Sequence, residues 1–176
     1  PRPLTPSRPE GEEPAADTLQ PDAVLLAQGK AVHLLLEVLP ALPPAQWHEA
    51  GEILLKRQGG APHLLEKVLE ILQHPQFAPI FGPGSQAEVP ITATIVQNEM
   101  RRILSGQMDR LVVTAEKVLV LDYKTNRHIP ATPAEIPPRY RQQLEGYAAA
   151  LAQLYPDRPI ETAILWTTGP TLMPLG

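Results

Sequence analysis

One stretch of this sequence limits the fold more than any other: residues 105–125, SGQMDRLVVTAEKVLVLDYKT. Two apolar runs of β-branched and aliphatic residues, Leu111–Val113 and Val118–Leu121, flank the short polar stretch Thr114–Lys117. Runs of this kind separated by so few residues are typical of an antiparallel β-hairpin. Apolar residues also occupy both alternating positions of the first run, which indicates a sheet that is covered on both faces.

The register of this hairpin decides which charged residues meet. If the turn is centred on residues 115–116, Asp109 lies opposite Asp122, and directly opposed residues have Cβ atoms roughly 4.5 to 5.5 Å apart. Successive side chains alternate between faces, so Lys124 lies on the side of Asp122 whereas Tyr123 points the other way. We therefore expect Asp109, Asp122 and Lys124 to form one cluster. The other expected pairs are Val113 with Val118 and Leu111 with Val120.

The chemistry of this cluster depends on what separates its two carboxylates. Two carboxylates this close repel each other, and the pKa of one rises unless a cation lies between them. All-oxygen ligation suits a hard cation such as Mg²⁺, which binds through one or two carboxylates together with a substrate phosphate. Lys124 would then orient the attacking water or stabilise negative charge on the phosphate. The alternative from the hairpin alone is a solvated ion pair at a strand end.

A wider pattern surrounds these residues. It consists of Glu88, GQMDR at 106–110, DYKT at 122–125 and QLEGY at 143–147. Across residues 28–166 this pattern resembles the PD-(D/E)XK nuclease superfamily, and within it the nuclease domains of RecB- and AddA-type helicase-nucleases, most closely the AddA type. The resemblance implies an α/β (α+β) fold with a restriction-endonuclease-like core, in which helices flank a small mixed sheet, and an N-terminal helical segment.

The resemblance also implies roles for the residues of the hairpin. Asp109 and Asp122 would bind the catalytic metal, with the backbone carbonyl of Tyr123 as a further ligand. Lys124 would be the catalytic lysine. Members of the family carry a Gly-x-x-x-His run on an upstream helix whose histidine reaches the metal, and GKAVH here makes His33 a candidate ligand. Without the resemblance, a single histidine in an apolar helix is usually a packed or surface residue.

Three more polar residues belong to the expected site. Glu88 opens the strand-like run EVPITATIV, and the resemblance implies that it contributes to the metal or water shell; alone it would be a surface glutamate. Gln143 and Tyr147 are four residues apart and share a helix face. The resemblance implies that they border the active site and help to place DNA, whereas spacing alone favours a core tyrosine flanked by a glutamine. Pro90 lacks a backbone donor, which suggests an edge strand or a bulge.

By resemblance, the chain is a Mg²⁺-dependent DNA exonuclease domain of an AddA-like helicase-nuclease that acts in double-strand break repair and recombination. A metal-activated water would hydrolyse the phosphodiester, Mn²⁺ is an expected substitute, a helicase motor would deliver single-stranded DNA, and an AddB-like protein is the expected partner. Cysteine is absent, which excludes an iron–sulfur cluster and thiolate chemistry. Two alternatives stay open: an inactive nuclease-like module that guides DNA or supports a helicase complex, and a metal-independent interaction domain.

The rest of the chain divides by composition. Residues 1–21, PRPLTPSRPEGEEPAADTLQP, are proline-rich and acidic, and we expect them to be a disordered linker. Residues 22–82 are expected to be a helical segment packed on the nuclease core, and residues 83–176 to be that core. The expected helices are 22–39, 45–57, 62–73 and 140–155; the expected strands are 88–96, the two strands of the hairpin and 160–167.

Net charge and hydropathy limit the kind of protein to which this chain can belong. A net charge of −4 is unexpected for a DNA-binding protein, because phosphate contacts normally come from Lys and Arg, and it favours a domain tethered to a motor. No P-loop is present, so we expect no ATPase in this chain. The chain opens in linker sequence without Met, which suggests the C-terminal part of a longer protein. No segment approaches the roughly 18 apolar residues of a membrane span, so we expect no membrane partner and a bacterial-type cytoplasmic location.

Overall fold

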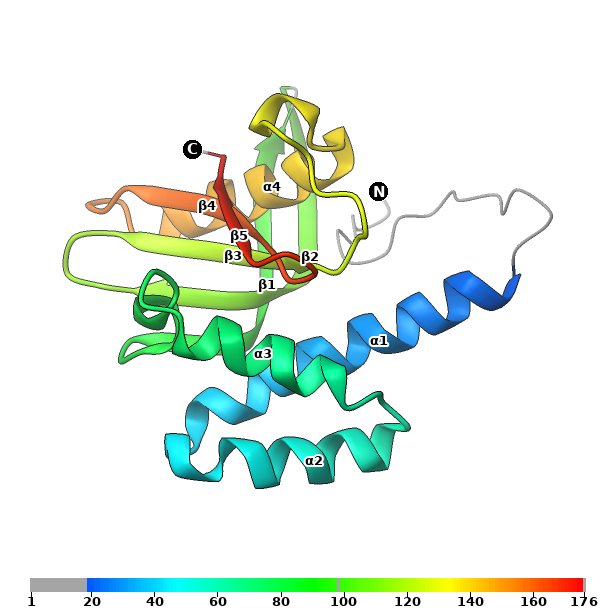
Figure 1. Cartoon of the computed structure of the whole chain (residues 1–176). Coiled ribbons are helices and arrows are strands. Elements are labelled where there is room, and N and C mark those ends of the chain that lie inside the picture. Colours follow the sequence, from blue (N-terminus) through cyan, green and yellow to red (C-terminus); the bar gives the residue numbers. More distant parts are fainter. Residues whose placement is uncertain (1–18, 98, 176) are drawn as a thin grey trace.

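A five-stranded mixed sheet forms the centre of the molecule. In a computed structural model that describes residues 19–97 and 99–175, the strands lie in the order β1-β2-β3-β4-β5 (Figure 1). β3 and β4 run parallel, and the other neighbouring strands run antiparallel. The strands are β1 (Ser85–Gln97), β2 (Met100–Val113), β3 (Val118–Lys124), β4 (Ile160–Trp166) and β5 (Thr171–Pro174).

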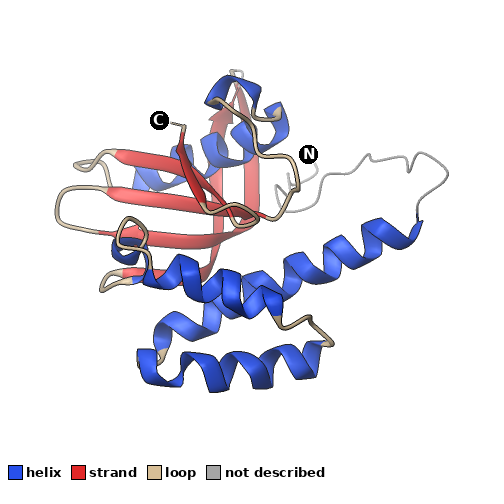
Figure 2. Cartoon of the chain, viewed as in Figure 1, coloured by secondary structure: helices blue, strands red, loops and turns tan. Residues whose placement is uncertain are grey.

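Helices cover both faces of this sheet (Figure 2). On one side α1 (Leu19–Val38) and α3 (His63–Gln73) lie next to the sheet, and α2 (Trp47–Gln58) packs against these two helices. The other face carries α4 (Pro138–Leu154), which forms the crossover between the parallel strands β3 and β4. The expected α/β class with a small mixed sheet flanked by helices is confirmed. Short 3-10 helices lie at Leu39–Ala41, Pro44–Gln46, Ala78–Phe81 and Pro133–Glu135.

Two hydrophobic cores result, one on each face, as the apolar pattern of the hairpin predicts. Along β3, Leu121 and Tyr123 pack toward α1 and α3, whereas Val118 and Val120 pack toward α4. The α1 side chains that enter the first core are Ala31, Val32, Leu35, Leu36 and Leu39, and the α4 side chains that enter the second are Leu144, Tyr147, Ala150 and Leu151.

The expected hairpin register is confirmed as far as the strands pair. Val113 pairs with Val118 and Leu111 with Val120, and the last pair is Arg110 with Leu121. Asp109 and Asp122 lie one position beyond that last pair, where β2 continues along β1 and β3 continues along β4. The two aspartates therefore stand where the strand pairs separate.

The sheet is larger than the sequence indicates. β2 begins at Met100 and pairs with β1 over most of its length, although its first half carries Arg101 and Arg102 and shows no apolar run. The short strand β5 was also not expected. β1 is an edge strand, which confirms the inference from Pro90. The helices α2, α3 and α4 begin and end within two residues of their expected bounds.

The domain boundaries remain predictions. Residues 1–18 of the expected linker lie outside the described residues, and α1 begins at Leu19, before the expected residue 22. The helices α1 to α3 share one core with β2, β3 and β4. The expected helical segment therefore packs directly on the sheet.

Helix α1 corrects one expectation. The segment Ala23–Ala41 is long and apolar enough to cross a membrane, with a mean hydropathy of 1.4 over its most apolar window. The expectation that no segment approaches a membrane span was therefore wrong. One such helix is weak evidence for a span because core helices of soluble proteins meet the same criterion. In this fold Leu35, Leu36 and Leu39 are fully buried against the sheet and α3, but only 28% of the apolar window is buried.

The turn before β1 depends on Gly84. Its φ of +82° suits glycine, and a Cβ added there would lie 2.6 Å from the carbonyl oxygen of Val113. We expect Gly84→Ala to lower the free energy of unfolding by about 3 kcal/mol, measured by urea denaturation. Gly82→Ala is the matched control, since its nearest atom would be 3.7 Å away. Equal losses in the two variants would contradict this account of the turn.

Candidate metal centre

Glu88 on β1 and Asp109 on β2 lie opposite each other. Ala87 pairs with Arg110 and Val89 with Met108, which sets Glu88 opposite Asp109. Glu88 has a φ of +51°, which is uncommon for a residue with a side chain. On either side of this position β2 changes the face that it presents, because Met108 enters the core under α4 whereas Arg110 contacts Leu36 of α1. The alternation of side chains between the two faces of the sheet is therefore interrupted at the position of Glu88 and Asp109.

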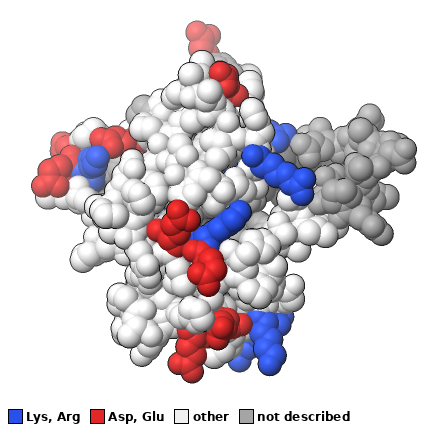
Figure 3. Space-filling view, in the orientation of Figure 1, with Lys and Arg blue, Asp and Glu red and all other residues white. Residues whose placement is uncertain are grey.

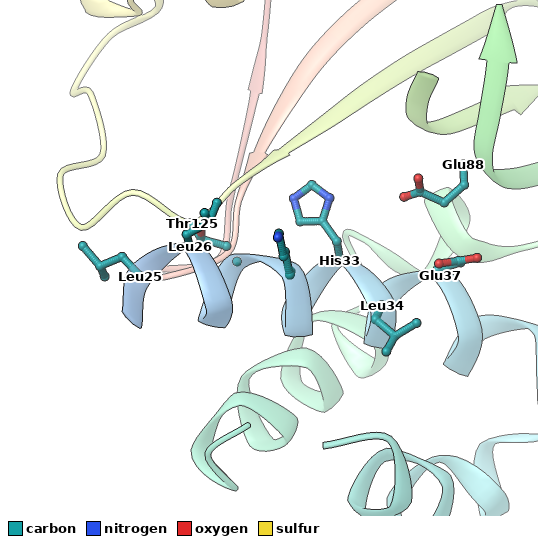
Figure 4. Close-up of a pocket in the computed structure, with 9 residues that line it drawn as sticks. Leu25, Leu26, His33, Leu34, Glu37, Glu88 and Thr125 are labelled. Atoms are coloured by element: carbon teal, nitrogen blue, oxygen red, sulfur yellow. The ribbon is translucent and has the colours of Figure 1, made fainter. Parts of the chain in front are cut away.

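His33 joins these carboxylates from α1. One ligand atom each from His33, Glu88 and Asp109 lies within 4.8 Å of the others, and all three side chains are partly exposed. The Nδ1 of His33 is 3.5 Å from Oδ1 of Asp109. The His33 ring rises from α1 toward the sheet, and the Glu88 carboxylate lies to one side of it (Figure 4). We call His33, Glu88 and Asp109 the ligand cluster.

Two members of the ligand cluster, His33 and Glu88, line a pocket of about 390 Å³ beside α1. Lys30 and Glu37 of α1 line it, as does Thr125 just after β3. Gly29 lies closest to Thr125, where an added Cβ would be 3.0 Å from the threonine Oγ1. The glycine of the Gly-x-x-x-His run therefore allows α1 to approach the end of β3, which brings His33 to the cluster.

Charge and burial shift the protonation of the ligand cluster. Burial disfavours charge on the His33 ring, but the adjacent Asp109 carboxylate outweighs it and raises the pKa of His33 above 6.5. Burial and the negative charge of Asp109 raise the pKa of Glu88 above 4.5. Both shifts are those expected where acidic groups and a histidine share a small, partly buried volume.

Tyr123 supports the cluster through its backbone and its ring. Its N–H donates a hydrogen bond of 2.6 Å to Oδ2 of Asp109, and its ring packs edge-on against the ring of His33 at 5.4 Å between centroids. The side chain is buried, and burial raises the pKa of the phenol well above 10. The ligand role expected for the Tyr123 carbonyl stays a prediction.

Asp122 and Lys124 form a pair of their own. Oδ2 of Asp122 is 2.5 Å from Nζ of Lys124, and the two side chains are 8% and 18% exposed. Burial raises the pKa of Asp122 although Lys124 opposes the shift. Burial disfavours charge on Lys124, but Asp122 outweighs it and raises the pKa of Lys124. Asp109 lies beside His33 and Glu88, and Asp122 is held against Lys124. The negative charge of Asp109 raises the pKa of both Asp122 and Lys124.

Tyr140, in the first turn of α4, covers this pair. Nζ of Lys124 lies 4.3 Å from the centre of its ring, a cation–π contact. The phenol oxygen of Tyr140 accepts a hydrogen bond from Asn126 at 3.4 Å. Nothing in the spacing of the α4 residues distinguishes Tyr140 from a core position, so its contact with Lys124 was missed. The lysine is therefore held from two sides.

Gln143 and Tyr147 lie next to each other on α4, as expected. Nε2 of Gln143 is 3.5 Å from the phenol of Tyr147, which donates to the carbonyl of Gln107 at 2.9 Å. Tyr147 is buried, in line with its expectation as a core residue. Gln107 in turn donates to the carbonyl of Glu88 at 3.2 Å. The pair is thus tied to the strand that carries Asp109, and its role toward DNA stays a prediction.

The donors present suit a hard divalent cation. The ligand cluster offers one imidazole nitrogen and carboxylates from two residues, and a third acidic residue, Asp122, lies nearby, paired with Lys124. Carboxylate and imidazole donors with room for waters suit Mg²⁺ or Mn²⁺ better than a thiophilic metal. On the face shown in Figure 3, basic and acidic side chains are scattered over a mostly uncharged surface.

One protein family and several known proteins are similar to this chain. A family model described as the PD-(D/E)XK nuclease superfamily matches residues 15–171. Two Streptococcus pyogenes proteins from different strains, both named as ATP-dependent helicase/nuclease subunits, are each 27% identical over 138 residues. The alignments cover 72% of this chain and 11% of each relative, so the chain corresponds to a small part of those proteins. A crystal structure of SSO0001 is 13% identical, covers 88% of this chain and 78% of that one, and superposes with a TM-score of 0.39.

Proposed function

The chain belongs to the PD-(D/E)XK nuclease superfamily, and from this premise we propose that it is a Mg²⁺-dependent deoxyribonuclease that acts as an exonuclease. The observation that carries the proposal is the ligand cluster, His33, Glu88 and Asp109, beside a buried lysine that is already paired with an aspartate. Membership of a nuclease superfamily implies a nucleic-acid substrate. The likeness to the streptococcal helicase/nuclease proteins supports an AddA-like chain in double-strand break repair, with an AddB-like partner.

The residues have separate tasks in this proposal. His33, Glu88 and Asp109 would hold the metal, and Asp122 and the carbonyl of Tyr123 would complete its surroundings. A bound Mg²⁺ supplies a Lewis acid for the phosphodiester and lowers the pKa of water to produce a nucleophile. Lys124, kept protonated by Asp122, provides a fixed positive charge that orients water or stabilises negative charge on the phosphate. Gln143 and Tyr147 would position the strand from α4.

The decisive experiment uses this chain and DNA labelled at either end. We expect labelled single-stranded DNA to be shortened in Mg²⁺ or Mn²⁺ and to stay intact in EDTA or Ca²⁺. The end label that is lost first gives the polarity. A preparation of Asp109→Asn purified in the same way controls for contaminating nucleases. No cleavage in any metal, for the chain or for the whole protein with its partner, would leave the inactive DNA-guiding module as the better account.

Metal affinity is expected to depend on pH. Metal ligation needs neutral His33 and ionised Glu88, and both have raised pKa values, so protons compete with the metal at higher pH than for free side chains. Affinity for Mn²⁺, measured by electron paramagnetic resonance, should therefore fall as the pH drops from about 8 to about 6. His33→Asn should weaken binding and flatten this part of the profile. An unchanged slope in His33→Asn would contradict the assignment of the histidine.

A further inference from the structure

Arg110 is a buried cation whose partners in the described structure are neutral. Its side chain is 3% exposed, and its three nitrogens donate to three different acceptors. Nε donates to the phenol of Tyr123 at 2.7 Å, Nη1 to the hydroxyl of Ser85 at 2.7 Å, and Nη2 to the carbonyl of Leu36 at 2.6 Å. The guanidinium also lies 4.8 Å from the centre of the Phe81 ring. These three hydrogen bonds and the ring contact hold the guanidinium in one orientation.

Each acceptor stands on an element that carries or contacts a member of the ligand cluster. Leu36 is one helical turn after His33 on α1, and Ser85 lies three residues before Glu88 on β1. Tyr123 donates its N–H to Asp109 and packs its ring against His33. Since Arg110 directly follows Asp109 on β2, one side chain joins all four elements that build the centre, α1, β1, β2 and β3.

We propose that Arg110 is a positioning residue for the metal centre, which sets the separation of His33, Glu88 and Asp109 through Leu36, Ser85 and Tyr123. The proposal rests on the proposed metal-dependent function. Only arginine has a planar fork that reaches three acceptors in different directions. Lysine keeps the charge but places a single nitrogen there, so it cannot hold α1, β1 and β3 at once. Outer partners of metal ligands typically change metal affinity about 10- to 100-fold when they are replaced.

The test separates positioning from general stability. Arg110→Lys and Tyr123→Phe are compared with wild type for Mn²⁺ affinity by electron paramagnetic resonance, after near-ultraviolet circular dichroism has established the native fold. Tyr123→Phe keeps the ring and the backbone N–H and removes only the acceptor for Arg110. Arg158→Lys is the matched control, because Arg158 donates to the carbonyl of Thr114 at 2.9 Å in the turn between β2 and β3 and contacts none of the three acceptors of Arg110.

We expect Mn²⁺ affinity to fall about 10- to 100-fold in Arg110→Lys and about tenfold in Tyr123→Phe, and to change less than twofold in Arg158→Lys although its melting temperature falls. Wild-type affinity in a folded Arg110→Lys would overturn the proposal. If that variant does not fold, Tyr123→Phe decides alone: weaker binding supports positioning, and unchanged binding overturns it. Absence of Mn²⁺ binding by the wild type would instead overturn the proposed function itself, and the positioning role with it.

Discussion

The Asp109→Asn variant is expected to lose nuclease activity by a factor on the order of 10³ and to bind Mn²⁺ much more weakly, while it keeps its fold. Oδ2 of Asp109 accepts the Tyr123 N–H at 2.6 Å, whereas Oδ1 faces His33. To keep the bond to Tyr123, an asparagine must place its carbonyl oxygen at the Oδ2 position. Its NH₂ group then points into the ligand cluster, where it is a donor and cannot serve as a ligand.

The measurement combines cleavage of end-labelled DNA, Mn²⁺ titration and urea denaturation of the same preparation. Glu116→Gln is the matched control, because it removes one carboxylate from the exposed turn of the same hairpin. That control should cleave DNA at the wild-type rate. Wild-type cleavage by a folded Asp109→Asn would show that the hydrolysis does not pass through this centre.

Breaking the Asp122–Lys124 pair is expected to have the largest effect on stability. Both side chains are mostly buried, so removal of one partner leaves an uncompensated charge in a medium that solvates it poorly. We expect Asp122→Asn and Lys124→Met each to lower the free energy of unfolding by about 3 kcal/mol at neutral pH, measured with urea. The double variant should recover much of that loss, because it buries no charge.

A second ion pair in the same sheet provides the comparison. Lys117 and Glu161 approach to 2.7 Å, but each side chain is 45% exposed, so solvent screens their attraction. Removing either partner should cost less than about 1 kcal/mol. If the Lys117 and Lys124 variants lose equal stability, burial does not govern the energetics of the inner pair. Lys124→Met should in addition slow cleavage while it keeps the Mn²⁺ affinity, since lysine is not a ligand.

The apolar runs and turn residues of the sequence were enough to predict the hairpin between β2 and β3. The hairpin register followed from two apolar runs and a short turn, and it correctly placed Asp122 and Lys124 on one face of β3. The first half of β2 was not predicted, because Arg101 and Arg102 interrupt any apolar alternation there. Its strand structure comes from pairing with β1, which is a tertiary effect.

The geometry of the candidate site could likewise not be predicted from the sequence, because it depends on tertiary packing. The resemblance supplied His33 and Glu88, but their approach to Asp109 depends on how α1 packs and on the positive φ of Glu88, which no residue pattern encodes. The sequence analysis assigns Arg110 no role beyond its place in the GQMDR run. An arginine inside a strand with apolar neighbours is a usable signal of a buried, hydrogen-bonded cation, although its acceptors on three other elements cannot be read from the sequence.

The positions of the three ligands in the sequence also determine at which stage of folding the chain can bind a metal. Its members stand at residues 33, 88 and 109, on elements that meet only after α1 has packed and the long β1–β2 hairpin has closed. A nascent chain or a fragment that ends before Asp109 lacks one of the three ligands. Metal binding then reports global folding, and metal should raise the melting temperature of the whole fold by mass action instead of ordering one loop.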